Sequence, residues 1–261
     1  MTRRATIVLA ALAVVSLAGA EPAAAERLVT SLSSHRVMIT QYFTGEELVL
    51  FGSVERDANS VPRRTGYDIV ATVTGPRESL VTRRKGRVLG IWVNVDSRTF
   101  VDAPSYLAIL TTRPVMQIAD PDTLRRLQIG LDNMLFPQRI GVDLGDVPRN
   151  DPLRAAFLRL QRAHHLYVEE PNGVTFLTPT LYRASIPLPA QAPVGTYEVD
   201  VKLFADGAMI ARTTSALEVM KVGFEQFVAS AARDHGLLYG VATAMMALMT
   251  GWLASIVFRK D

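Results

Sequence analysis

The sequence contains no cysteine among its 261 residues and only four histidines. Without thiols the chain can form no disulfide, no thiolate metal site and no thiol redox centre. Its formal net charge of +3 is too small to indicate a nucleic-acid-binding protein. The Gly-x-Ser-x-Gly elbow, the phosphate-binding loop, the dinucleotide fingerprint and His-Glu-x-x-His are missing as well. Since no common catalytic signature is present, we expect a protein that is not an enzyme.

Charge is also absent from residues 237–258. As an α-helix at about 1.5 Å per residue, this run extends roughly 33 Å, enough to cross a hydrocarbon core of about 30 Å. Tyr239 and Trp252 lie near its two ends, as aromatic residues do at membrane interfaces. The alternative is a buried core helix. Core helices keep a polar face, however, whereas this run offers only hydroxyls, which can bond to their own helix. We predict one transmembrane helix at residues 237–258.

Residues 1–25 have the order of a secretory signal peptide: Arg3-Arg4, an apolar run and Ala23-Ala24-Ala25. The run is short for a membrane span, so a retained second anchor is the weaker interpretation. The arginine pair also allows twin-arginine export, although Thr6 replaces the aromatic residue that this signal prefers. A cleaved signal and a stop-transfer helix predict a single-pass inner-membrane protein with its ectodomain in the periplasm. Arg259-Lys260 in the short tail agrees with a cytoplasmic C-terminus.

The region 26–118 contains short apolar runs separated by turn residues, at 47–54, 67–74, 87–95 and 105–112. Gly75-Pro76 and Lys85-Gly86 are turn signals. This spacing favours an antiparallel sandwich of immunoglobulin-like type. Trp92 has apolar neighbours, so we expect a ring buried between two sheets; an exposed aromatic anchor for a ligand is the alternative.

The period becomes helical in residues 119–165. Asp120-Pro121 and Asp151-Pro152 each place an N-cap before a proline at the first helical position. The first helix is expected to continue through Leu131 and Met134, and residues 137–150 are expected to form an irregular loop. Strands return afterwards, with clear alternation around Tyr197, which we expect to be buried, and a hairpin turn at Asp206-Gly207.

We therefore predict a mainly β protein with a two-helix insertion in the middle and a C-terminal transmembrane helix. The expected divisions are a signal peptide (1–25), a β-sandwich region (26–118), a helical insertion (119–165), a second β region (166–222), a juxtamembrane helix (223–236), the transmembrane helix (237–258) and a cytoplasmic tail (259–261).

Three groups of residues are candidates for binding, and each has a structural alternative. His164 and His165 with Glu169 and Glu170 could hold a metal ion, or they could simply follow a helix C-terminus. The methionines of the span, Met245, Met246 and Met249, could be soft ligands of copper or be apolar filler. The basic residues 83–87 could attract an anion or lipid headgroups, or mark a charged hairpin tip. We favour the structural interpretation each time, and assign no catalytic, cofactor-binding or metal-binding residue.

The predicted span carries small residues at intervals of three and four, namely Gly240, Ala244, Ala247, Gly251 and Ala254. Such a stripe lets another transmembrane helix approach closely. We expect it to pack against a multi-span membrane partner, and a lipid-facing helix rich in alanine is the alternative.

Several local motifs carry a resemblance to a known family: Phe43-Thr-Gly45, Leu50-Phe51-Gly52, Gly75-Pro76, Arg83-Arg84-Lys85, Gly90-Ile-Trp-Val-Asn94, Gly223-Phe-Glu225, Tyr239-Gly240 and Gly251-Trp252. Together they resemble the alphaproteobacterial family named "putative transmembrane protein", whose members are secreted and have one C-terminal span. The resemblance covers the whole mature chain and implies no catalytic activity. It also implies an accessory role in transport, since genes of this family lie beside sulfite-exporter-type transporters.

Two classes of function follow. The first is a membrane-anchored, non-enzymatic binding or accessory module for a partner such as a transporter. The second is an extracytoplasmic hydrolase or metal-dependent enzyme, with a site assembled from scattered residues. A concave pocket in which His164, Glu169 and Glu170 converge would favour the second class.

Overall fold

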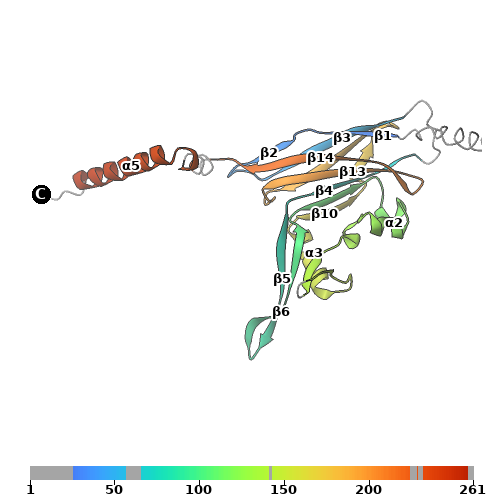
Figure 1. The fold of residues 1–261 in the computed structure, drawn as a ribbon, viewed down its shortest axis with the longest axis horizontal. Coiled ribbons are helices and arrows are strands. Elements are labelled where there is room, and N and C mark those ends of the chain that lie inside the picture. Colours follow the sequence, from blue (N-terminus) through green and yellow to red (C-terminus); the bar gives the residue numbers. More distant parts are fainter. Residues whose placement is uncertain (1–25, 57–65, 141–142, 224–227, 229–231, 258–261) are drawn as a thin grey trace, which may run out of the picture.

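The computed structural model shows a mainly β protein with one long apolar helix at its C-terminal end (Figure 1). It describes residues 26–56, 66–140, 143–223, 228 and 232–257. The predicted signal peptide and cytoplasmic tail lie outside these residues. The mainly β class is confirmed.

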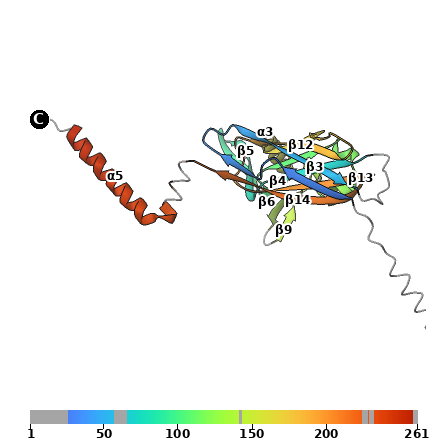
Figure 2. The same ribbon diagram turned by 90° about the horizontal axis from the view of Figure 1, so that it is seen from above.

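Two sheets stack to form the centre of the molecule. The four-stranded sheet is antiparallel, with the order β1 (Arg27–Leu32), β3 (Gly45–Glu55), β12 (Leu181–Pro189), β11 (Val174–Phe176). The six-stranded sheet has the order β10 (Tyr167–Pro171), β7 (Leu107–Thr111), β4 (Asp68–Thr74), β13 (Gly195–Ala205), β14 (Ala208–Lys221), β2 (Arg36–Ile39). From above, β3 and β12 lie over the strands of the larger sheet (Figure 2).

The alternation of apolar residues builds the core between these sheets. Tyr197, Val199 and Val201 of β13 face Leu50 and Tyr182 of the smaller sheet in one buried cluster. The burial of Tyr197 is confirmed, and its hydroxyl donates to the carbonyl of Pro193 at 2.7 Å. A tyrosine that bonds to the backbone just upstream of its own strand is typical of immunoglobulin-like sandwiches, so this packing is compatible with that prediction.

The sequence predicted antiparallel sheets, but the six-stranded sheet is mixed. β10 pairs with β7 in parallel, and β14 pairs with β2 in parallel. A parallel pair needs a long crossover, and the helical insertion between β7 and β10 supplies one.

This insertion covers the other face of the six-stranded sheet and forms a second core there. Val70 and Ile109 of the sheet pack with Leu124, Phe136 and Phe157. The insertion contains α2 (Pro121–Arg126), α3 (Pro152–Ala163) and the short 3-10 turns η1 (Val115–Gln117) and η2 (Leu131–Asn133).

The two predicted helix starts are confirmed, because Asp120 and Asp151 each accept two backbone N–H groups and are followed by proline. The predicted continuation of the first helix is wrong. α2 ends at Arg126, and Gln128 and Gly130 adopt positive φ values of 53° and 92°, which no helix tolerates. Residues 137–150 also differ from the expected loop, since β8 (Pro137–Ile140) and β9 (Asp143–Asp146) form a hairpin within them.

A third sheet has the order β5 (Arg77–Val88), β6 (Ile91–Pro104), β8, β9. The β5–β6 hairpin stands out from the stacked sheets (Figure 1). Its turn is Leu89-Gly90 and not Lys85-Gly86, because Lys85 and Gly86 pair with Asn94 and Val93 within the strands. Trp92 is 68% exposed, so its predicted burial is wrong: none of the described sheets packs against the two strands at that point.

The helix α5 (Gly236–Val257) agrees with the predicted span to within one residue at each end. Its section Gly236–Ile256 has a mean hydropathy of 1.5 and is 0% buried, so it is long and apolar enough to cross a membrane and is not a core helix. Half of the predicted juxtamembrane helix lies outside the described residues; within its described part, residues 228, 232–234 and 236 are helical.

Candidate interaction surface on the hairpin arm

The outer part of the β5–β6 hairpin, residues 83–97, is here termed the hairpin arm. Every one of its residues is exposed except Gly86, which is half-buried. The hairpin is buried again closer to the body, at Thr82 and Phe100. The arm is therefore a two-stranded ribbon with solvent on both faces.

One face of the arm is apolar. Val88 pairs with Ile91 and Gly86 with Val93, and directly paired residues point to the same face. Val95 joins them, because a Cβ on Gly86 would lie only 2.7 Å from Val95 Cγ1. The side chains of this face are 41–67% exposed, so they form a continuous apolar strip without a cover in the described part of the chain.

The opposite face is basic. It carries Arg83, Lys85 and Arg87 along β5, and Trp92 lies directly across from Arg87. Neither Arg83 nor Lys85 forms an ion pair with another described residue, whereas Arg84 lies 3.7 Å from Asp96. The arm thus combines positive charge with exposed apolar surface, and the basic residues 83–87 do belong to a hairpin close to its tip.

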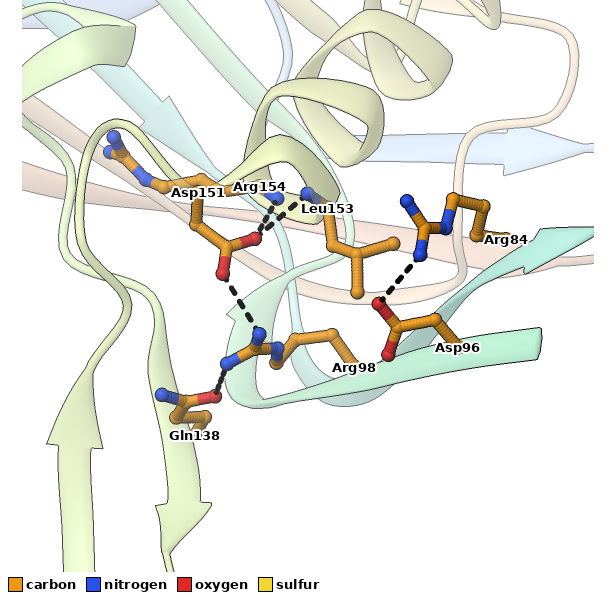
Figure 3. Close-up of polar contacts among 7 residues, drawn as sticks. All are labelled: Arg84, Asp96, Arg98, Gln138, Asp151, Leu153 and Arg154. Carbon is orange, nitrogen blue, oxygen red and sulfur yellow. Dashed lines mark hydrogen bonds and ion pairs between the residues drawn. The ribbon is translucent and has the colours of Figure 1, made fainter.

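The base of the arm is fixed to the helical layer (Figure 3). Arg98 Nη2 donates to Asp151 Oδ2 at 2.8 Å and its Nη1 bonds to Gln138. The other oxygen of Asp151 accepts from the backbone N–H groups of Leu153 and Arg154, at 2.8 and 3.0 Å. The same strand and helix also meet through Phe100 and Phe157, whose ring centroids lie 4.5 Å apart. The arm is therefore held at a set angle to the body.

His165, Glu169 and Glu170 line one open pocket of the body, but the histidine and glutamate candidates do not form a metal site. His164 is the exposed C-cap of α3, and Glu169 accepts the backbone N–H of Leu131 at 2.8 Å. Glu169 and Glu170 are successive residues of β10 and so point to opposite faces. Among the described residues no group of three His, Asp or Glu side chains could hold a metal ion. These residues give the metal-dependent enzyme no support.

Met245, Met246 and Met249 are exposed along α5.

Two buried charges of β13 compensate one another. Asp200 and Lys202 are 8% and 6% exposed and pair together, and Arg212 Nε lies 2.7 Å from Asp200 Oδ1. The hydrogen bond with Asp200 raises the pKa of Arg212 above its ordinary value. An open cleft beside α2 contains another pair, in which Arg113 Nε donates to Asp68 Oδ1 at 2.8 Å. We interpret both groups as structural, because their charges are paired internally.

Sequence reasoning missed the apolar face of the arm, because it assigned the run around Trp92 to the core. The available signal was the closeness of that run to the basic residues 83–87, which a buried strand pair could not accommodate.

Comparison with known protein families identifies a relationship over most of the chain. A family model described as "Putative transmembrane protein (Alph_Pro_TM)" matches residues 27–260, which include the β-rich body, the hairpin arm and α5. No curated protein matches the chain.

Proposed function

The chain belongs to this family of transmembrane proteins, and on that premise we propose that it is a non-enzymatic binding or accessory module anchored in the inner membrane. In this proposal residues 1–25 direct export and are removed, α5 crosses the membrane once, and the β-rich body lies in the periplasm. The observation that carries the proposal is the exposure of α5, since an apolar helix of this length needs a lipid or protein environment.

The partner that fits best is a multi-span membrane protein such as a transporter. The small residues of α5 support this, because a Cβ at Gly240 or Gly251 would meet nothing within 4 Å. A helix of such a partner could therefore approach the α5 backbone closely. The hairpin arm adds a second exposed surface, outside the span.

Topology can be tested with single cysteines, since the chain contains none. Leu177→Cys lies on an exposed bend of the body, and Asp261→Cys is at the C-terminus. A membrane-impermeant maleimide should label the first variant in intact spheroplasts and the second only after lysis. The opposite pattern would place the body in the cytoplasm and refute the proposal, as would N-terminal sequencing that recovers Met1 from the mature protein.

The binding role is tested separately, by crosslinking the full-length protein in native membranes before detergent extraction. Mass spectrometry should then identify one membrane protein in constant ratio to the chain. Recovery of the chain alone, under crosslinking conditions that capture a known complex, would argue against an accessory module.

A further inference from the structure

We propose that the hairpin arm is a second membrane-contact site, which inserts its tip into a surface of anionic phospholipids. The inference rests on the proposed anchoring by α5 and adds a lipid ligand for the body of the protein. It follows from four properties of the arm: its exposed apolar tip, its turn, its charge and its distance along the chain from the anchor.

The tip is apolar on both strands and around the turn. Leu89 is 98% exposed, Trp92 68% and Ile91 67%. A two-stranded ribbon without a third strand or a covering helix has little stability of its own in water. Indole rings favour the headgroup region of a bilayer, and aliphatic side chains favour the acyl boundary below it. The tip therefore has the composition of an interfacial membrane anchor.

The first residue of the turn, Leu89, also supports insertion into lipid. Leu89 and Gly90 both have positive φ, 49° and 86°, as a two-residue type I′ turn requires. Asn or Asp is preferred at the first position, and a left-handed leucine is unfavourable. At 98% exposure Leu89 gains almost no packing from the folded chain in return. Insertion into lipid would supply the apolar contact that this leucine lacks.

Charge selects the kind of surface. The arm contains four basic residues, Arg83, Arg84, Lys85 and Arg87, against one acidic residue, Asp96. They lie between the apolar tip and the body, so a tip-first insertion brings them to the level of the phosphates, and Arg87 beside Trp92 can extend its guanidinium towards them. A second copy of the arm would be repelled by the same charge. Anionic phospholipid matches both the charge and the apolar tip.

The anchor keeps the arm close to the bilayer. Residues 222–235 connect β14 to α5 and reach at most roughly 50 Å when extended. Because the protein is already tethered to the bilayer, the effective concentration of lipid around the arm is high, and a weak affinity of the tip for lipid suffices to keep it inserted.

The fluorescence of Trp92 tests the proposal directly. The chain has two tryptophans, so Trp252→Phe leaves Trp92 as the sole emitter. The full-length variant is reconstituted into vesicles of phosphatidylcholine, with or without phosphatidylglycerol, and with acyl chains that are brominated or plain. We expect a blue shift and quenching by brominated chains when phosphatidylglycerol is present, and much less of both without it. Water-like emission in both lipid mixtures would overturn the proposal.

Two matched pairs of variants, made in the Trp252→Phe protein, separate the contribution of charge from that of the apolar tip. Arg83→Gln should lower the ratio of inserted to free arm by about fivefold, the effect of one cation near an anionic surface, whereas Arg159→Gln, at another exposed arginine without an ion pair to a described residue, should leave it unchanged. Leu89→Asn should abolish quenching without loss of folding, whereas Leu177→Asn, at an exposed leucine on the body, should not affect quenching. Equal effects within either pair would contradict a specific contact.

The outcome also distinguishes this inference from the proposed anchoring. Resistance to alkaline extraction reports insertion of α5, independently of Trp92. Extractable protein refutes the anchoring, whereas inserted protein with an unquenched Trp92 refutes only the lipid contact. A blue shift without quenching by brominated chains means that protein covers the tip, and refutes the lipid contact as well.

Discussion

Arg98 and Asp151 form an ion pair of 2.8 Å that joins the base of the hairpin arm to the first turn of α3. Both side chains are less than one-third exposed, at 29% and 11%. Asp151 has two functions in this arrangement, since its other oxygen caps the helix. The direction of the arm and the start of α3 thus depend on the same carboxylate.

Substitutions at the two residues should separate these functions. Arg98→Ala removes the ion pair and the hydrogen bond to Gln138 but leaves the cap, and should cost about 1 kcal/mol. Asp151→Ala removes the pair and the cap and should cost about 1 kcal/mol more. Asp151→Ser restores a capping oxygen and should recover most of the difference. Denaturant midpoints of the three variants test this order, and equal midpoints for Arg98→Ala and Asp151→Ala would show that the cap contributes nothing.

Two aromatic residues of β6 should differ sharply in their contribution to stability. Phe100 is fully buried against Phe157, so Phe100→Ala should lower the free energy of unfolding by about 3–5 kcal/mol. Trp92 lies on the exposed arm, so Trp92→Ala should change the free energy of unfolding by less than about 0.5 kcal/mol. A thermal midpoint that falls as far for Trp92→Ala as for Phe100→Ala would place the indole in a core.

The contrast between these residues shows what the sequence could predict. The signals at Asp120-Pro121 and Asp151-Pro152 are local, because an N-cap bonds to backbone groups two and three residues away, and both helix starts were correct. The burial of Trp92 depends on whether a second layer covers its strand, which no neighbouring residue determines. The parallel pairing of β10 with β7 depends likewise on a crossover of more than fifty residues. For the same reason the basic residues 83–87 could be listed as a candidate, while the apolar face opposite them could not.

Alkaline pH should destabilise the body through its buried tyrosines. Burial raises the pKa of Tyr106, Tyr167 and Tyr197 above the ordinary value of about 10. Between that value and the higher folded pKa, the unfolded chain releases protons that the folded chain keeps. The stability from these groups is therefore complete below about pH 10 and is lost as the pH rises further.

The measurement is the free energy of unfolding at a series of pH values on either side of 10. Tyr197→Phe should lower stability at neutral pH, because the hydrogen bond to Pro193 is lost, yet reduce the alkaline slope. Tyr42→Phe, at a ring that is 81% exposed, is the matched control and should leave the slope as in the parent. An alkaline slope that is the same in all three proteins would contradict the assignment.

The turn of the arm should become more stable when its leucine is replaced. Leu89→Asn gives the Asn-Gly pair that a type I′ turn favours, and should raise the free energy of unfolding by up to about 1 kcal/mol. Leu89→Val, a β-branched residue in the same left-handed conformation, should lower it. Thermal midpoints in detergent test both changes, and a loss of stability in Leu89→Asn would mean that the leucine is held by packing after all.

The last prediction concerns the surface of α5. If the helix only tethers the body, any apolar sequence of equal length should replace it. If its small residues contact a partner helix, adding side chains to them should separate the two proteins without preventing insertion. The variant Gly240→Leu/Ala247→Leu/Gly251→Leu fills the stripe, and Ala242→Leu is a control that adds one leucine on the opposite side of the helix.

Both variants should resist alkaline extraction, because leucine only increases the apolarity of the span. The partner identified by crosslinking should be lost from the triple variant and retained by Ala242→Leu, since a close helix contact tolerates no added side chain at the interface. Recovery of the partner in equal yield with both variants would show that the stripe faces lipid. The partner would then be held by the periplasmic body, and truncation of the arm would be the next variant to test.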